Sequence, residues 1–440
     1  MKALATTLVV ALKVTLLVSV TRAENWPQWR GPHFDGSSAE KNLPAEFSKT
    51  NHVKWVAALP GPSAGTPIVW GDRVFVSSTD TRTKTLRAIC LDAQTGKPLW
   101  EQEAGMGFKL DDRSNLASPS PITDGTLVWF YYGTGDLVAF DFAGKKIWSR
   151  EIQKDYGQFA FNWTYGSSPM LYGDKLYVQV LQRDVPVRGR GRKDGPNDSY
   201  LLALDPTTGK ELWKHIRPSD AHEESREAYS TPIPFEHNGH RGLLVLGGDC
   251  ITAHDLKTGA ELWRWGTWNP TRITHWRLVP SPVAGGGVAL ACAPKGSAIY
   301  ALKLDSKGTL TDKDLAWTTS QEREVSSDVG TPLFYKGRFY VLNGDRKTIA
   351  RVDPATGKAD WIGELGTRIK IESSPTGADD KIYFQNFRGE VFVVAAAEQF
   401  KLLHVAAMGD EDDNDLRASV AVSHGKLFIR TGGKLYCVGE

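Results

Sequence analysis

The sequence predicts an all-β fold: an eight-bladed β-propeller of four-stranded antiparallel blades. Two repeated patterns predict this fold. Asp-x-x-Thr-Gly-x-x-x-Trp occurs four times, and a Ser/Thr-Pro pair that opens an apolar run occurs seven times, with an eighth run that lacks the proline. The starts of these eight runs lie 43 to 63 residues apart. Repeats of that length are typical of one four-stranded blade per unit.

The first pattern is interpreted as a turn followed by a packing residue. An Asp at the start of a turn accepts hydrogen bonds from its own backbone, and Gly supplies a positive φ. Trp adds a large apolar face, so a Trp at the same place in each unit is predicted to pack between neighbouring blades. The intact copies span 92–100, 205–213, 255–263 and 353–361. With the degenerate copies, the predicted docking residues are Trp55, Trp100, Trp148, Trp213, Trp263, Trp317 and Trp361.

One unit shows the expected strand order. Residues 169–172 and 175–179 are predicted strands that a Gly-Asp hairpin turn joins, 200–205 is the third strand, and the fourth contains Trp213. The last unit ends after its third strand, whereas residues 53–59 around Trp55 have no unit before them. We therefore expect 53–59 to complete the last blade, which closes the ring and removes exposed sheet edges.

This organisation divides the chain into a signal peptide at 1–23, a leader at 24–52 and a single propeller domain at 53–440. Lys2, an apolar stretch and the small residue Ala23 are typical of a cleaved export signal. The alternative is a retained membrane anchor, which Lys13 disfavours because it interrupts the apolar run. We expect an exported protein, periplasmic or secreted, with no membrane span once the signal is removed.

Charge and cysteine content narrow the class of partner. Without residues 1–23 the chain has 50 basic and 51 acidic residues, and this near-neutral balance disfavours nucleic acid. The four cysteines, which we expect to be buried free thiols, are too scattered for a disulfide scaffold. No C-x-x-C-H motif for covalently attached haem occurs. We expect a monomer whose partner is an extracytoplasmic protein or a glycan.

The repeats resemble the PQQ repeat, the tryptophan-docking propeller of the quinoprotein alcohol dehydrogenase-like superfamily, from residue 53 to the C-terminus. The leader segment 25–32 (NWPQWRGP) is similar to the start of exported PQQ-like propeller proteins. The resemblance implies one of two functions. One branch holds PQQ and calcium on the propeller axis as dehydrogenases. The other comprises non-catalytic propellers that bind protein partners, such as the outer membrane protein assembly factor BamB.

The motifs favour the non-catalytic branch. The dehydrogenase branch typically has adjacent cysteines, and no two cysteines are adjacent in this chain. Asp410, Asp412 and Asn414 match the start of a calcium loop, but Asp415 and Ala421 stand where Gly and Glu are expected. No firm cofactor is predicted, and no zinc, P-loop or dinucleotide motif occurs.

The leading hypothesis is therefore a non-catalytic binding scaffold for a protein or a carbohydrate. The alternative is a PQQ- and calcium-dependent quinoprotein dehydrogenase that oxidises an alcohol or sugar, with Asp328 or Glu372 as the general base. The BamB branch has a lipid-modified cysteine that this chain lacks after its signal, so outer-membrane assembly is not carried over from the resemblance.

The candidate binding residues lie in segments that join one unit to the next. In a propeller these segments line one mouth of the axial funnel, and loops on a rigid scaffold commonly carry binding groups. The alternative is a solvated loop face whose charges pair with one another. The predicted mouth residues are Asn162, Trp163, Tyr165, Glu227, Tyr229, His275, Trp276, Arg277, Asp328, Lys370, Glu372 and Arg417.

A basic loop at 184–199 is predicted to overhang the same mouth, because it joins the second and third strands of the third unit. Its cations could hold an acidic partner or a polyanionic glycan, and a flexible surface loop without a partner is the alternative. The basic residues of this loop are Arg188, Arg190, Arg192 and Lys193.

Overall fold

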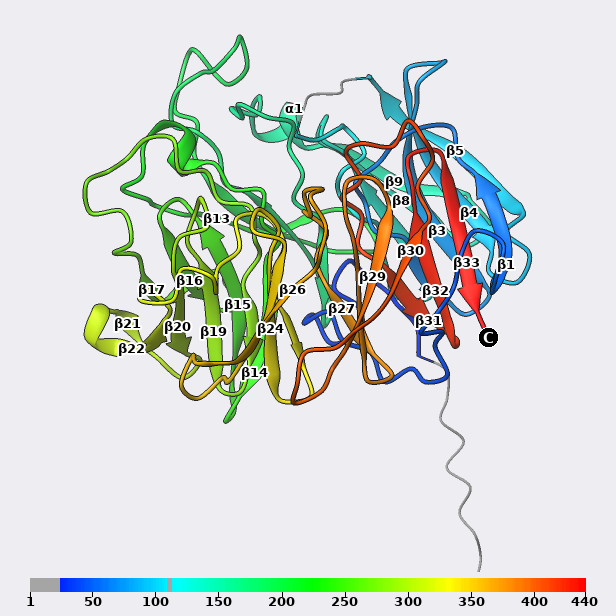
Figure 1. The fold of residues 1–440 in the computed structure, drawn as a ribbon. Coiled ribbons are helices and arrows are strands. Elements are labelled where there is room, and N and C mark those ends of the chain that lie inside the picture. Colours follow the sequence, from blue (N-terminus) through cyan, green and yellow to red (C-terminus); the bar gives the residue numbers. More distant parts are fainter. Residues whose placement is uncertain (1–23, 109–112) are drawn as a thin grey trace, which may run out of the picture.

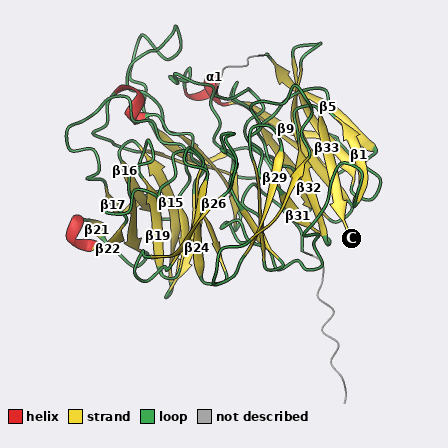
Figure 2. Cartoon of the chain, in the orientation of Figure 1, coloured by secondary structure: helices red, strands yellow, loops and turns green. Residues whose placement is uncertain are grey.

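The computed structural model describes residues 24–108 and 113–440, and the signal peptide predicted at 1–23 lies outside them. Within this part the chain forms eight sheets arranged in a ring around an axis (Figure 1), with very little helix (Figure 2). The innermost strands of neighbouring sheets contact each other around the ring. The predicted eight-bladed β-propeller is confirmed.

The blades are numbered 1 to 8 in chain order, each from its inner to its outer strand. Blade 1 contains β2 (Ile68–Trp70), β3 (Arg73–Asp80), β4 (Thr85–Asp92) and β5 (Pro98–Met106). Blade 2 contains β6 (Ile122–Thr123), β7 (Leu127–Tyr131), β8 (Asp136–Asp141) and β9 (Lys146–Glu151). Blade 3 contains β10 (Met170–Tyr172), β11 (Lys175–Val180), β12 (Tyr200–Leu204) and β13 (Glu211–Ile216). The strands of blade 3 thus agree closely with those that the sequence predicts.

The remaining blades repeat this order. Blade 4 contains β14 (Ile233–His237), β15 (His240–Gly247), β16 (Cys250–His254) and β17 (Glu261–Trp265). Blade 5 contains β18 (Val283–Gly285), β19 (Val288–Cys292), β20 (Ile299–Lys303) and β22 (Leu315–Thr318). Blade 6 contains β23 (Leu333–Tyr335), β24 (Arg338–Asn343), β25 (Thr348–Val352) and β26 (Ala359–Glu364). Blade 7 contains β27 (Thr376–Ala378), β28 (Lys381–Gln385), β29 (Glu390–Ala395) and β30 (Leu402–Ala407).

Blade 8 combines the two ends of the chain. It contains β31 (Ala421–Ser423), β32 (Lys426–Arg430), β33 (Lys434–Gly439) and the N-terminal strand β1 (Val53–Ala58). β1 pairs antiparallel with β33 and places Trp55 opposite Cys437. The closure of the ring by residues 53–59 is therefore confirmed.

Blade 4 carries one strand more than predicted. The insertion between β20 and β22 forms β21 (Gly308–Thr309), which pairs parallel with β17 at the outer edge of blade 4. Three short helical segments complete the inventory: α1 (Ile152–Tyr156) and the 3₁₀ helices Glu223–Arg226 and Asp312–Asp314. No helix in the described ranges is long and apolar enough to cross a membrane.

Trp55, one of the tryptophans of the repeat, lies between blades 8 and 1. Trp55 donates its indole N–H to the carbonyl of Ala93 in blade 1 at 3.1 Å, and its ring covers Gly96. A Cβ at Gly96 would lie 2.5 Å from that ring, and the φ of Gly96 is +70°. The glycine of the motif is therefore required both by its backbone and by the tryptophan of the preceding blade.

The aspartate of the motif shapes the same turn. Asp92 accepts hydrogen bonds from the backbone N–H of Gln94 at 3.0 Å and of Thr95 at 2.7 Å. These hydrogen bonds, with that of the Thr95 hydroxyl first, lower the pKa of the Asp92 carboxyl. The first repeat pattern thus forms a turn, and its tryptophan packs at the contact between two blades. The four cysteines are buried free thiols, as expected.

The leader, residues 24–52, runs across one end of the ring (dark blue in Figure 1) and contacts the inner strands of distant blades. Trp26 pairs with Val69 of blade 1, and Ser37 pairs with Gly377 of blade 7. Arg30, which is buried, donates hydrogen bonds to the carbonyls of Pro332 and Pro375 at 2.9 and 3.0 Å. The leader therefore closes one end of the propeller axis.

Candidate binding site in the axial pocket

A closed circle of hydrogen bonds surrounds the propeller axis. In each blade the hydroxyl residue that precedes the inner strand donates its backbone N–H to the hydroxyl oxygen of the equivalent residue in the next blade, at 2.7 to 3.2 Å. The last member, Ser419, donates to the first, Thr66. This hydroxyl ring comprises Thr66, Ser120, Ser168, Thr231, Ser281, Thr331, Ser374 and Ser419. It explains why Ser or Thr stands at this place in every repeat.

A cavity of about 150 Å³ occupies the axis beside the hydroxyl ring. Six of the eight ring residues line it, and Thr66 and Ser281 do not. Trp29 of the leader also lines the cavity, and the Arg30 guanidinium stacks 5.7 Å from the centre of the Trp29 ring. Because the leader closes this end of the axis, we describe the cavity as an axial pocket with Trp29 as its floor.

Five predicted mouth residues line the axial pocket: Trp163, Tyr229, Arg277, Glu372 and Arg417. Trp29, Arg113 and six residues of the hydroxyl ring also line the pocket and were not among the predicted site residues. The Ser/Thr-Pro pattern was the available signal for the ring, since it occurs once per blade at the entry to the inner strand.

Glu372 is held between two cations. Its carboxylate accepts a hydrogen bond from Arg417 Nε at 2.7 Å and lies 2.7 Å from Lys370 Nζ. Burial opposes ionisation of this side chain, but Arg417 and Lys370 outweigh burial and lower the pKa of the Glu372 carboxyl. Lys370 thus contributes to the site through Glu372 and does not itself line the axial pocket.

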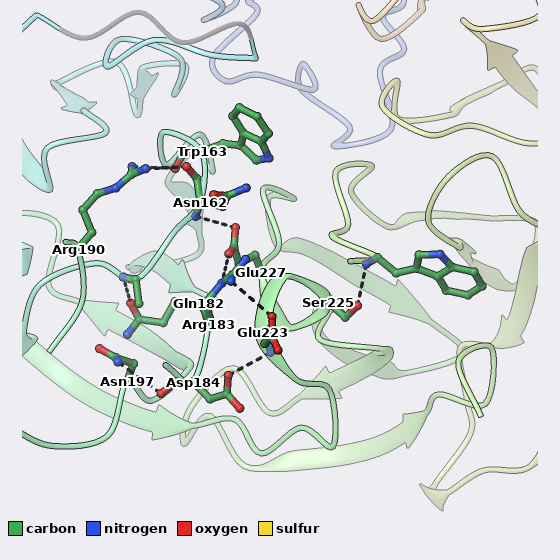
Figure 3. A network of polar contacts seen from close by, with 12 residues as sticks. Asn162, Trp163, Gln182, Arg183, Asp184, Arg190, Asn197, Glu223, Ser225 and Glu227 are labelled. Atoms are coloured by element: carbon green, nitrogen blue, oxygen red, sulfur yellow. Dashed lines mark hydrogen bonds and ion pairs between the residues drawn. The ribbon is translucent and has the colours of Figure 1, made fainter. Parts of the chain in front are cut away.

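Glu227 joins three segments around the mouth (Figure 3). It accepts hydrogen bonds from Arg183 Nε at 2.6 Å, from the backbone N–H of Asn162 at 2.9 Å and from the Tyr229 hydroxyl at 2.7 Å. The side chain is fully buried, and burial raises the pKa of its carboxyl despite these donors. Glu227 therefore holds these three segments together at the rim of the mouth.

Arg277 and Asp328 form the third ion pair of the mouth. Their side chains lie 3.3 Å apart, and Asp328 also accepts a hydrogen bond from the backbone N–H of Lys295 at 2.7 Å. Both side chains are largely buried. The three carboxylates that the sequence placed at the mouth are thus each paired with an arginine.

The basic loop lies against the rim, as Figure 3 shows for Arg190 beside Asn162 and Trp163. Arg190 donates a hydrogen bond to the carbonyl of Asn162 at 2.6 Å. The guanidinium groups of Arg113 and Arg188 lie 5.6 and 5.4 Å from the centre of the Trp163 ring. The loop therefore packs on the mouth through Arg188 and Arg190, whereas Arg192 and Lys193 are exposed.

Seven of the twelve predicted mouth residues do not line the axial pocket. Asn162, Glu227, Asp328 and Lys370 make the contacts described above, and the other three are Tyr165, His275 and Trp276. Tyr165 packs in the core against Phe159 and Tyr131, and its hydroxyl donates to the carbonyl of Gln179 at 2.6 Å. These contacts hold the Tyr165 ring in the core rather than at the mouth. His275 is exposed and Trp276 is half-buried, and neither belongs to the pocket lining.

The donor set of the site does not fit calcium. Within 24–108 and 113–440 no group of three or more His, Cys, Asp or Glu side chains converges as a metal site. The carboxylates nearest the axis are each held by an arginine, and the positive charge of these arginines disfavours a divalent cation, which prefers several oxygen ligands. At the acidic loop, Asp410 pairs with Lys49 and Lys434.

A β-propeller with the repeated tryptophan seam and a lined axial pocket defines a protein of the PQQ-repeat class. The family described as outer membrane protein assembly factor BamB matches residues 40–182 and 247–440, and the chain belongs to this family. The match leaves out 183–246, which include the basic loop.

Two curated relatives have different activities in their names. The chain is 25% identical over 277 residues to a polyvinylalcohol dehydrogenase of Sphingopyxis sp. (strain 113P3), covering 56% of this chain and 40% of that protein. It is 22% identical over 426 residues to a tetrathionate hydrolase of Acidithiobacillus ferrooxidans, covering 83% of this chain and 77% of that protein. The chain thus matches less than half the length of the dehydrogenase.

Solved structures share the fold. BamB from Moraxella catarrhalis superposes with a TM-score of 0.59 at 14% identity, covering 87% of this chain and 98% of that one. A europium-containing methanol dehydrogenase superposes with a TM-score of 0.68 at 12% identity, covering 95% and 98%. BamB and a methanol dehydrogenase therefore share this architecture, and the fold alone does not separate proteins of different function.

Proposed function

We propose that this protein is a non-catalytic, extracytoplasmic scaffold that binds a protein or a carbohydrate at the axial mouth. One observation carries the proposal: the carboxylates of Glu227, Asp328 and Glu372 are each engaged by an arginine. Because each ion pair holds its side chains in place, the rim of the mouth has a fixed shape. Its hydrogen-bond donors and acceptors therefore stand in fixed positions. The basic loop, which lies on the same rim, belongs to the proposed binding surface.

The alternative is a PQQ- and calcium-dependent dehydrogenase that oxidises an alcohol or a sugar. The names of several relatives favour it, among them the polyvinylalcohol dehydrogenase. The surroundings of the two candidate general bases, Glu372 and Asp328, disfavour this alternative. Glu372 has a lowered pKa, which makes it a weaker base, and Asp328 already accepts hydrogen bonds from Arg277 and Lys295.

The test of this proposal is a titration of the purified protein with PQQ and Ca²⁺, followed by absorbance and by dye-linked oxidation of alcohols and sugars. We expect neither stoichiometric binding nor turnover. Tight one-to-one binding of PQQ with turnover would overturn the scaffold and establish the dehydrogenase. A heat-denatured sample controls for non-specific uptake of the quinone.

The extracytoplasmic location is part of the proposal. It is supported by the sequence of residues 1–23, which has a basic start, an apolar stretch and a small residue at the expected cleavage position. N-terminal sequencing of the exported protein should find a start directly after Ala23. Recovery of intact residues 1–23 in a membrane fraction would indicate an anchor instead. Light scattering of the mature chain tests the expected monomer.

A further inference from the structure

The hydroxyl ring has unused donors. Each Ser or Thr hydroxyl has one O–H donor and two acceptor lone pairs, and the N–H of the preceding blade occupies one lone pair. None of the eight hydroxyls donates a hydrogen bond to another group of the described residues. The eight residues are only 1% to 6% exposed. Buried polar groups are nearly always satisfied, so the O–H groups of the six residues that line the axial pocket can find acceptors in whatever fills it.

The pocket combines these donors with aromatic surfaces. Six ring residues line its wall, Trp29 forms its floor, and Trp163 and Tyr229 stand at its mouth. The volume of about 150 Å³ limits the ligand to a small group, such as a single ring that is received in part. The pocket is closed below by the leader, so a ligand enters from the mouth and is received end-on.

Three arginines line the wall: Arg113, Arg277 and Arg417. Arg277 is held by Asp328, Arg417 is held by Glu372, and the Arg113 guanidinium lies over the Trp163 ring. A charged ligand would have to compete with these largely buried ion pairs. A polyol has no such requirement, because its oxygens accept from the ring hydroxyls and its own O–H groups donate to their remaining lone pairs. An aromatic floor adds apolar contact with one face of a sugar ring.

We infer that the axial pocket binds the neutral hexopyranose ring at the end of a carbohydrate, with the six pocket-lining residues of the hydroxyl ring as its polar wall and Trp29 as its floor. The inference rests on the proposed binding function and selects carbohydrate over protein as the ligand of this pocket. It also assigns the Ser/Thr position of the repeat a second use, in addition to joining neighbouring blades.

The chain offers a matched pair of variants for the test. Thr331 and Thr66 occupy equivalent ring positions and accept equivalent hydrogen bonds, but only Thr331 lines the pocket. Thr331→Val and Thr66→Val therefore remove the same hydroxyl from the ring, inside and outside the pocket. Thr331→Ser keeps the hydroxyl and serves as the rescue variant. Thermal melting of each variant checks that the fold is retained.

The mature protein and its variants would be mixed with glucose, galactose, mannose or N-acetylglucosamine, and binding measured by saturation-transfer NMR and calorimetry. Glucuronate serves as the charged counterpart of glucose. We expect at least one neutral hexose to bind with one-to-one stoichiometry and more tightly than glucuronate. Thr331→Val should weaken that binding at least tenfold, whereas Thr66→Val and Thr331→Ser should change it less than threefold.

Three outcomes overturn the inference: no neutral hexose binds, glucuronate binds better than glucose, or the two valine variants behave alike. If these occur while the quinone titration stays negative, the scaffold proposal stands and only the carbohydrate assignment fails. Turnover with PQQ and Ca²⁺ would instead remove the scaffold proposal itself. The two failures are therefore distinguishable.

Discussion

Ser419 donates its backbone N–H to the hydroxyl of Thr66 at 3.2 Å, and 353 positions of the chain separate the two residues. This contact joins blade 8 to blade 1 and completes the hydroxyl ring. The pairing of β1 with β33 closes the outer part of the same blade. Closure of the ring therefore depends on residues from both ends of the chain, both at the axis and at the outer edge of blade 8.

Replacement of Trp55 by alanine should strongly destabilise the protein. Trp55 is 7% exposed and carries the packing and the hydrogen bond that join β1 to blade 1. We expect a loss of about 3–5 kcal/mol in the free energy of unfolding, measured by chemical denaturation. Val56, the next residue on the same strand, is 47% exposed, so Val56→Ala is the control and should cost well under about 1 kcal/mol. Equal losses would contradict closure through Trp55.

Substitution of Gly96 by alanine should separate a clash from backbone strain. Gly96 and Gly173 both have a positive φ, of +70° and +60°, but a Cβ at Gly96 meets the Trp55 ring and one at Gly173 meets nothing within 4 Å. Gly173→Ala should cost about 1 kcal/mol for strain alone. Gly96→Ala should cost about 1–3 kcal/mol more, because the indole must move. Similar melting temperatures for the two variants would show that the seam yields to the added methyl group.

The stability of the protein should depend on pH through Asp249. This residue is 4% exposed, one of its carboxylate oxygens has no hydrogen-bond partner within the described part of the chain, and burial raises the pKa of its carboxyl to about 6. The folded state therefore binds this proton more tightly than the unfolded state. The stabilising contribution is complete below about pH 4 and is lost as the pH rises through about 6.

Asp249→Asn removes that dependence. The variant should be more stable than the original chain at pH 7.5, by up to about 3 kcal/mol, and the difference should disappear near pH 4. Asn also tolerates the φ of +59° at this position. Urea denaturation at both pH values measures the difference, and Asp305→Asn at an exposed position is the control. A stabilisation that is the same at both pH values would exclude ionisation of Asp249 as its cause.

Glu372→Gln should show the opposite dependence. Despite burial, Arg417 and Lys370 lower the pKa of Glu372, so its contribution to stability is present above the usual carboxyl pKa and is lost as the pH falls. At pH 7.5 the variant should lose about 3 kcal/mol, because two cations are left without their shared carboxylate. Near pH 3 the loss should shrink. Denaturation curves at the two pH values, with Glu364→Gln on an exposed strand position as the control, test this.

The repeated parts of the fold were predictable because the same residue types recur at the same positions in each repeat. The turn at Asp92, the seam at Trp55 and the pairing of β1 follow from patterns that recur in phase. The strand β21 was not predicted, because its two residues pair with the preceding blade only through an insertion that has no counterpart elsewhere in the chain.

The site was less predictable, because its contacts join residues far apart in sequence. Trp29 reaches the axis through a leader that has no repeat, and Arg183 finds Glu227 across 44 positions. Tyr165 was predicted at the mouth, but its ring packs against Tyr131 and its hydroxyl donates to Gln179 in the core. Charged residues near the axis could be named from the sequence, but their partners could not.

The leader has a consequence for the order in which the chain folds. Arg30 hydrogen-bonds to blades 6 and 7, and β1 pairs with the final strand, so the residues synthesised first find their places last. Such long-range contacts form slowly, because a large loop must close before they contribute any stability. The early segment therefore stays unpaired until the last strand has been synthesised. Throughout that interval the incomplete ring exposes two sheet edges to other chains.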